Sequence, residues 1–173
     1  MSSITIRLPL HGLRSAFVNW CYRSTHPIYG QLTRRGKPAW QLNVSEFKRM
    51  PPASLGAALG NFLQSNQLQL MPGFENHDIF HILLDYDTSA PQEVALQWCL
   101  LGNGKRSAYA ILTALIGFFI FPEHWGLLRS AYKRGQRMRS FHHWYFEYLL
   151  REDLAKLQAF LNYQKTKNYA AQH

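Results

Sequence analysis

The sequence is short of cysteine, of acidic residues and of long apolar runs. Cys21 and Cys99 are its two cysteines, and both have apolar neighbours, so we expect buried free thiols in a reducing compartment and no disulfide framework. The 10 acidic residues are outnumbered by 19 basic ones, and the resulting formal net charge of +9 attracts the chain to anionic surfaces. No recognised nucleic-acid-binding motif accompanies this charge, so we expect no nucleic-acid partner.

No stretch of the chain is apolar for the length of a membrane span. The longest, 108–121, is interrupted by Tyr109 and Thr113 and stops at Pro122, whereas a helix needs about 20 residues to cross a bilayer. The first residues also lack the apolar core of a secretory signal. We therefore expect neither a transmembrane segment nor a signal peptide. Burial of 108–121 inside the protein and burial against a membrane surface both stay open.

Strand signals are almost absent, and apolar residues recur at helical spacing over much of the chain. With 173 residues, 47% of them hydrophobic, the chain is long enough to bury a sizeable core. The predicted fold class is all-α, a compact single domain of several helices with a short extended N-terminal arm. We expect helices over 15–24, 43–51, 55–63, 75–84, 91–101, 108–121, 123–134 and 141–163.

Local signals predict where several of these helices begin and end. Ser54 is an expected N-cap, and Ser89 begins a capping-box spacing ahead of the fifth expected helix. Gly135 is expected to act as a C-cap. Gly56 and Gly60 lie four residues apart within one helix, where each costs about 1 kcal/mol against alanine, so they indicate a close approach between helices.

The string His77-Asp78-Ile79-Phe80-His81, followed after eleven residues by Glu93, carries the clearest chemistry. His77 and His81 are four residues apart, so a helix projects both rings from one face, where they can share an ion. Asp78 is rotated by about 100° from His77, and it either binds the ion directly or orients a histidine. If a short connection leads to an antiparallel helix, we expect it to bring Glu93 back toward the histidines. Imidazole and carboxylate together suit zinc, and also iron or manganese.

The same residues also fit structural roles that need no metal. Two histidines at this spacing can be hydrogen-bonded core residues, and a helix N-terminus stabilises a carboxylate such as Glu93 without any ion. Rival motifs fail, because the zincin pattern needs Glu where Asp78 stands, and no paired Glu-x-x-His motifs of a di-iron bundle occur. Residues 102–105 lack the length of a nucleotide-binding P-loop.

Several segments together resemble the ubiquinone (coenzyme Q) biosynthesis family conventionally numbered four. The string His-Asp-x-x-His-x11-Glu resembles that family's metal motif, and residues 50–56 resemble its Pro-x-x-Ser-Leu-Gly segment. Residues 93–98 resemble its Glu-x-x-x-Lys-Trp helix, while 135–137 and 144–147 resemble its C-terminal half. The resemblance covers about 43–161, most of the chain.

The chain departs from the family pattern in three places. Residues 90–92 replace a small, glycine-containing segment before the glutamate, and the stretch between 63 and 77 is shorter than usual. The first 40 residues match no segment of the family. The expected organisation is therefore one helical domain over 1–173, with a variable N-terminal region at 1–42, a family-like core at 43–163 and a tail at 164–173.

The resemblance implies a zinc site built from His77, Asp78, His81 and Glu93, with His77, Asp78 and Glu93 also serving the reaction. It implies oxidative decarboxylation at ring carbon one of a polyprenylated hydroxybenzoate-type precursor, or alternatively a non-catalytic prenyl-lipid-binding or scaffold role. The implied partners are a prenylated or lipid-like molecule, a membrane surface, a second copy of the chain and other quinone-biosynthesis proteins. The implied location is cytoplasmic and peripheral to a membrane.

Basic residues near the expected site are candidates for holding the acidic headgroup of such a substrate, although each can equally belong to a solvated basic face. They are Lys105, Arg106, Arg137 and Arg139. The apolar helix at 108–121 is expected to line the pocket for the tail, or else to pack in the core.

Overall fold

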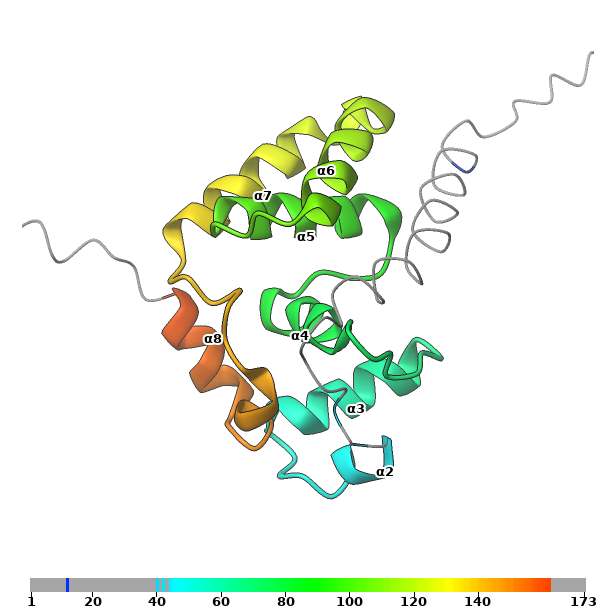
Figure 1. Cartoon of the computed structure of the whole chain (residues 1–173), viewed down its shortest axis with the longest axis vertical. Helices are drawn as coiled ribbons and strands as arrows, with labels where there is room; N and C mark the ends of the chain where they lie inside the picture. The colour runs from blue at the N-terminus through cyan, green and yellow to red at the C-terminus, as the bar shows by residue number, and fades with distance from the viewer. Residues whose placement is uncertain (1–11, 13–39, 41, 43, 163–173) are drawn as a thin grey trace, which may run out of the picture.

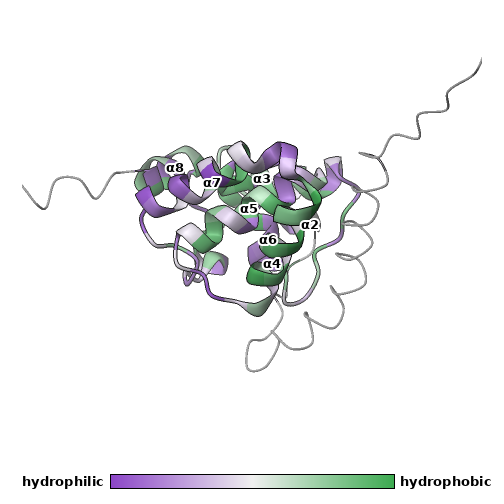
Figure 2. Ribbon diagram, turned by 90° about the horizontal axis from the view of Figure 1, so that it is seen from above, coloured by the Kyte–Doolittle hydropathy of each residue, from purple (hydrophilic) through white to green (hydrophobic). Residues whose placement is uncertain are grey.

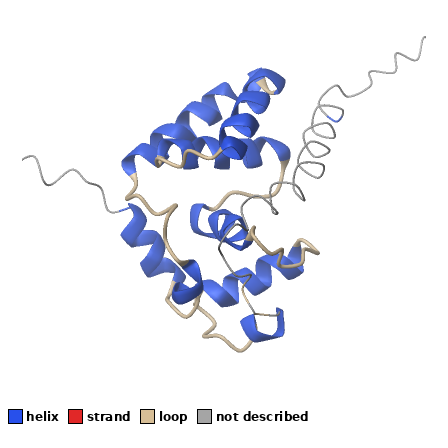
Figure 3. Cartoon of the chain, in the orientation of Figure 1, coloured by secondary structure: helices blue, strands red, loops and turns tan. Residues whose placement is uncertain are grey.

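The structure is a computed structural model that describes residues 12, 40, 42 and 44–162. Within these residues it is helical, with no β-strand (Figure 3), so the expected all-α fold is confirmed. The helix expected at 15–24 lies outside the described residues, as does Cys21. The α-helices are α2 (Val44–Phe47), α3 (Leu55–Ser65), α4 (Glu75–Leu84), α5 (Ala90–Gly102), α6 (Ala108–Ile120), α7 (Trp125–Arg137) and α8 (Leu154–Asn162), with 3-10 turns η1 (Pro122–His124) and η2 (Phe146–Leu149).

Two groups of helices make up the described part of the molecule (Figure 1). Helices α5, α6 and α7 lie together on one side, and α5 packs against both of its neighbours. Helices α2, α3, α4 and α8 form the other side, where α4 contacts α3 and α8. Helix α4 also contacts α5 directly. Since α4 carries both motif histidines and α5 carries the motif glutamate, the candidate site lies where the two groups meet.

The expected starts of the central helices are confirmed, with one exception in how they are capped. The Ser54 hydroxyl accepts a hydrogen bond from the Ala57 amide at 3.2 Å and so caps α3. Ser89 stands at the N-cap position of α5, but its side chain makes no capping hydrogen bond, so the capping-box prediction is wrong. Its backbone carbonyl instead accepts from the Glu93 amide at 2.8 Å, and a proline in the first turn removes one amide that would need a partner.

The prediction that Gly135 ends a helix is also wrong. Helix α7 continues to Arg137, and Gly135 is buried inside it. A Cβ atom at this position would overlap the carbonyl oxygen of Cys99 on α5. The glycine therefore serves the close packing of α7 on α5, which local sequence does not reveal.

The single long helix expected over 141–163 is a further error, because the chain makes η2 and only then forms α8. Backbone groups between the two pair with the start of α3 instead of with each other. The Leu55 amide donates to the Glu152 carbonyl at 2.9 Å, and the Gly56 amide donates to the Leu150 carbonyl at 2.7 Å. These long-range hydrogen bonds tie the C-terminal segment to α3 and replace the ladder of a continuous helix.

The close approach predicted from Gly56 and Gly60 is confirmed. A Cβ atom on Gly56 would overlap the Met50 sulfur, and one on Gly60 would lie 2.8 Å from the Phe47 Cβ. The core of the described part of the chain contains many fully buried apolar side chains. Its largest members are Phe47, Phe80, Phe121, Phe141, Phe146, Leu55, Leu59, Leu63, Ile79, Leu83, Leu84 and Leu96.

Hydrophobic colour is concentrated on α5 and α6, whereas α7 and α8 carry hydrophilic stretches (Figure 2). Within the described residues, no single helix has both the length and the apolar composition to cross a membrane. Helix α6 and the segment 122–137 reach that length and composition only together, with a bend of 106° between them.

Candidate metal centre

Contacts at its C-terminal end hold helix α4, which carries both motif histidines, in position. Asp85 ends the helix in the left-handed region with φ 56°, which turns the chain so that the Tyr86 carbonyl faces back toward α4. That carbonyl lies 3.0 Å from Nδ1 of His81. The Arg134 guanidinium of α7 donates to the Leu84 carbonyl at 2.6 Å and so holds the same end of α4 from outside.

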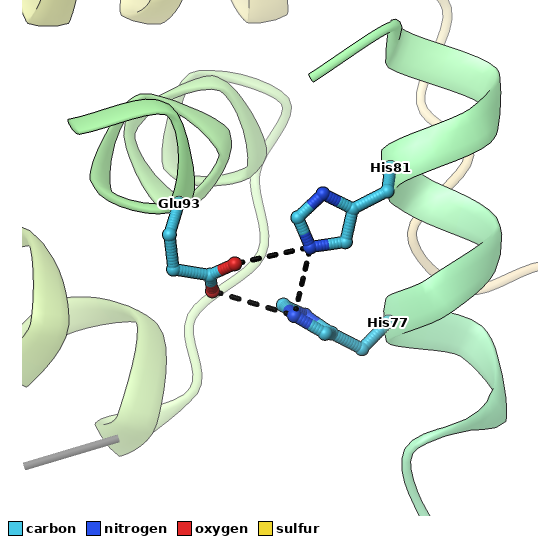
Figure 4. A group of neighbouring side chains, drawn as sticks. All are labelled: His77, His81 and Glu93. Carbon is cyan, nitrogen blue, oxygen red and sulfur yellow. Dashed lines mark hydrogen bonds and ion pairs between the residues drawn. The ribbon is translucent and has the colours of Figure 1, made fainter. Parts of the chain in front are cut away.

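His77, His81 and Glu93 converge at one point between α4 and α5 (Figure 4). Nε2 of His77 lies 3.3 Å from Oε1 of Glu93, and Nε2 of His81 lies 3.0 Å from Oε2. The two Nε2 atoms are 3.2 Å apart. All three side chains are buried, with exposed fractions of 4–8% for the residues. The convergence that spacing predicted for these three residues is thus present.

The hydrogen bond at the far side of the His81 ring fixes its tautomer. A backbone carbonyl can only accept, so Nδ1 of His81 carries the proton that is shared with Tyr86. In the neutral ring Nε2 is then unprotonated, and its lone pair faces the Glu93 carboxylate and the other imidazole. Such an arrangement repels unless a proton or a metal cation lies between these atoms. A backbone carbonyl on the second ring nitrogen is also the usual support of a metal-bound histidine.

The electrostatics of the group favour positive charge at its centre. Burial by itself would raise the pKa of Glu93, but the charges and hydrogen bonds of His77 and His81 outweigh it and hold that pKa well below its ordinary range. Burial would lower the pKa of His81, yet the Glu93 carboxylate raises it above its ordinary value. Glu93 is therefore an anion, and it stabilises cationic charge next to it.

The three donor groups fit a divalent metal by distance and by chemistry. Ligands about 2.0 Å from a tetrahedral ion are separated from one another by roughly 3.3 Å. The observed separations of 3.0–3.3 Å agree with that spacing. Two imidazoles and one carboxylate are a donor set for zinc, and equally for iron or manganese. Three protein ligands leave a coordination position for a substrate or water.

Asp78 does not join this group of three, although the sequence places it among the ligands. It is only half-buried, and helix geometry turns it about 100° away from His77. Burial raises the pKa of its carboxyl to about 6, against the opposing charges of His77 and His81. Asp78 therefore lies within the electrostatic reach of both histidines, and its direct binding to a metal stays a prediction.

Two supporting residues were not singled out by the sequence. The Gln97 side chain, one turn beyond Glu93 and 0% exposed, donates from Nε2 to Oε1 of Glu93 at 3.1 Å. The buried Glu75 accepts from the Gly73 amide at 2.7 Å and from the Trp40 amide at 3.3 Å, which fixes the start of α4. The four-residue spacing of Gln97 from Glu93 was an available signal, whereas the Glu75 contacts depend on loop geometry.

The four basic candidates are placed in different surroundings. Arg106 and Arg137 are exposed, and the Arg139 guanidinium lies 4.4 Å from the ring centre of Phe160. Lys105 is partly buried, and its Nζ atom lies 4.9 Å from the ring centre of Phe80, the residue before His81. Lys105 thus combines partial burial with an electrostatic interaction with Glu93.

Fold and site together define an all-helical protein with a buried two-histidine, one-carboxylate group between adjacent helices. Residues 74–167, more than half of the chain, match the family model described as "Coenzyme Q (ubiquinone) biosynthesis protein Coq4". The chain belongs to this family, and the match includes all four motif residues. Membership assigns it to ubiquinone biosynthesis and confirms the resemblance noted in the sequence.

The fold is also found in a solved structure. A crystal structure from Nostoc punctiforme PCC 73102, provisionally named a ubiquinone biosynthesis protein, aligns with a TM-score of 0.61 over 89% of this chain and 81% of that one. The aligned sequences are 14% identical, so this likeness shows the fold alone. No curated protein matches the chain significantly.

Proposed function

We propose that the chain is a metal-dependent protein of ubiquinone or related prenyl-lipid biosynthesis, in which His77, His81 and Glu93 hold one divalent ion, most suitably zinc. The observation that carries the proposal is the convergence of the two Nε2 atoms and the Glu93 carboxylate within 3.0–3.3 Å in a buried setting. An ion bound there would act as a Lewis acid toward a carboxylate or phenolate oxygen.

The proposed substrate is a polyprenylated hydroxybenzoate-type acid, and the proposed reaction is its oxidative decarboxylation. The ring carbon loses its carboxyl group as carbon dioxide and gains one hydroxyl oxygen, which is a two-electron oxidation and needs an external oxidant such as dioxygen. The chain's own part is to orient the acid and exclude water through its buried site. Asp78 is the candidate for moving a proton, because its carboxyl lies beside the histidine pair without being one of the three converging groups.

A non-catalytic role as a prenyl-lipid-binding or scaffold protein of a quinone-biosynthesis complex is the alternative. The two roles differ in what the fourth coordination position does. A ligand position that exchanges with added substrate favours an enzyme, whereas a fourth protein ligand favours a structural ion. Spectroscopy of a cobalt-substituted sample with and without a hydroxybenzoate would separate them.

Metal analysis of the purified protein tests the central claim. We expect one equivalent of metal in the unmodified chain and its loss in a His77→Gln, His81→Gln variant, whose amides still donate to Glu93 and so preserve the buried carboxylate's partners. His143→Gln, at an exposed position, is the matched control. Equal metal content in all three proteins would contradict the proposal.

We further propose that the outer face of α6 attaches the protein to an anionic membrane surface. Ile111, Leu112, Leu115 and Phe119 form an exposed stripe along this helix, and Phe119 is 75% exposed. Helix α6 has no charged residue, and the exposed positions of the neighbouring α7 include basic ones. An apolar stripe next to positive charge suits a bilayer with acidic headgroups.

The aromatic residues beside this stripe support the same partner. The indole nitrogens of Trp98 and Trp125 donate to backbone carbonyls at 3.2 and 2.7 Å, so the polar edge of each ring is satisfied within the protein. With Phe118 and Tyr132 they line an open apolar pocket between α5, α6 and α7. Such a pocket can receive a lipid chain.

Co-sedimentation with vesicles tests the membrane proposal. A Leu112→Ser, Phe119→Ser variant should bind phosphatidylglycerol vesicles more weakly than the unmodified chain, and Leu68→Ser, a similarly exposed apolar position elsewhere, should not. If the double variant keeps its vesicle binding but loses self-association, a second copy of the chain covers this face instead.

A further inference from the structure

The position of Lys105 follows from the way α5 ends. Gly104 adopts φ 101°, and the Lys105 amide donates to the Leu100 carbonyl at 2.9 Å. This is the hydrogen bond of a Schellman motif, which folds the chain back over the last helical turn. The lysine therefore returns toward the body of the protein, whereas Arg106, one residue later, is exposed.

The Lys105 ammonium group lies in an environment that does not neutralise it. Its Nζ atom is 4.9 Å from the ring centre of Phe80, and Phe80 itself packs against Phe141 and Phe146. Within the described part of the chain, no carboxylate forms an ion pair with Nζ. Burial lowers the pKa of Lys105 to about 8, while the charge of Glu93 acts in the opposite direction. The charge of Lys105 also contributes to lowering the pKa of His142.

Gln97, which lies beside Glu93, supplies an independent indication that a ligand belongs at the candidate metal centre. Its Nε2 atom donates to Glu93, and its Oε1 atom is buried with no hydrogen-bond partner among the described residues. The opposite orientation of the Gln97 amide would place its Oε1 atom against Oε1 of Glu93, and two acceptors cannot form a hydrogen bond. The contact with Glu93 therefore determines which way the amide faces. A fully buried acceptor without a donor is costly, and a ligand hydroxyl would satisfy it.

We propose that Lys105 is the anion-binding residue of this site and holds the carboxylate or phosphate oxygen of the ligand, with Gln97 accepting from a ligand hydroxyl. The proposal rests on the proposed metal function, because it places the ligand's anionic group beside the ion held by His77, His81 and Glu93. The Lys105 charge is desolvated, lacks an ion pair among the described residues and interacts electrostatically with Glu93. Both the acid of an aromatic ring and the headgroup of a prenyl phosphate share the required chemistry.

Calorimetric titration of the zinc-loaded protein tests this role. The two probes are 4-hydroxybenzoate and inorganic phosphate, and the proteins are the unmodified chain, Lys105→Met, Lys105→Arg and the exposed control Lys156→Met. We expect Lys105→Met to weaken binding about tenfold or more, since a charge-assisted hydrogen bond is lost. Lys105→Arg should keep most of the affinity, and Lys156→Met should leave it unchanged. The probe that binds identifies the anion as carboxylate or phosphate.

Zinc content, measured on the same samples, separates this proposal from the metal proposal. Lys105→Met should retain zinc, because the lysine is not a ligand. If Lys105→Met retains zinc and binds the probe as tightly as the unmodified chain, or if neither probe binds the zinc-loaded chain, the anion role is refuted. If the unmodified chain holds no zinc, the proposed metal function is refuted. The same titrations on the metal-free protein then test Lys105 alone. Weaker probe binding by Lys105→Met would support the anion role, and unchanged binding or no binding by the unmodified chain would refute it.

Discussion

Replacing Lys105 with methionine is expected to stabilise the metal-free protein at neutral pH. Burial lowers the pKa of Lys105 from 10.5 to about 8 despite the nearby Glu93 carboxylate. At about 1.4 kcal/mol per pKa unit, this shift corresponds to roughly 3 kcal/mol against the folded state. The lysine keeps some solvent contact, and the substitution gives up its contact with Phe80, so we expect a gain of about 1–2 kcal/mol.

The stability gained by Lys105→Met is expected to decrease as the pH rises. Between about pH 8 and 10.5 the unfolded chain keeps a proton on Lys105 that the folded protein has released. The unfolded state thus binds more protons, and the unfolding free energy of the unmodified chain rises with pH across this window. The advantage of Lys105→Met is therefore largest below pH 8 and closes as the pH approaches 10.5.

Urea unfolding at pH 7 and at pH 10 measures this difference. Lys156→Met, which removes an exposed lysine, should change the unfolding free energy by less than about 0.5 kcal/mol at either pH. A Lys105→Met variant that is less stable than the unmodified chain at pH 7, or that shows the same difference at both pH values, would refute the reasoning. A stabilising substitution that also weakens anion binding would identify Lys105 as a residue kept for function at the expense of stability.

Two further predictions concern the helices that hold the site. Gly135→Ala should lower the unfolding free energy by about 1–3 kcal/mol, because its Cβ would overlap the Cys99 carbonyl, whereas Gly126→Ala, with nothing within 4 Å, should not destabilise the protein. Denaturation curves that rank the two variants in the opposite order would contradict the observed packing of α7 on α5. Ser54→Ala should cost about 1 kcal/mol through loss of the α3 cap, and Ser89→Ala should cost almost nothing, since Ser89 makes no capping hydrogen bond. Similar losses in both variants would mean that Ser89 caps α5 after all.

The sequence predicted those parts of the fold in which the contacting residues that determine the local structure lie close together along the chain. The start of α3 follows from Ser54, whose hydroxyl reaches an amide three residues away. Convergence of His77 and His81 follows from their four-residue spacing, and the short connection to α5 returns Glu93 to them. In each case the deciding contact spans one helical turn or one loop.

The errors arose where a distant part of the chain decides the local structure. Gly135 has the residue type of a helix terminus, but its packing against Cys99 on another helix determines its place inside α7. The break between η2 and α8 follows from hydrogen bonds between the backbone of 150–152 and the start of α3. Likewise, the sequence offered four basic candidates without distinguishing them, because the burial of Lys105 depends on Phe80, which belongs to α4.

The surroundings of His81 indicate that the site is formed before any metal binds. The ring stacks on Phe62 with centres 5.5 Å apart, donates to Tyr86 and meets Glu93, so three different segments fix its orientation. The same helix buries Ile79 and Leu83 in the core at 0–1% exposure. A protein whose site is supported by its own core does not need the ion in order to fold, unlike small domains that fold only around zinc. Removal of metal by a chelator should therefore leave the helical content intact, and loss of metal in the His77→Gln, His81→Gln variant can be attributed to the ligands themselves.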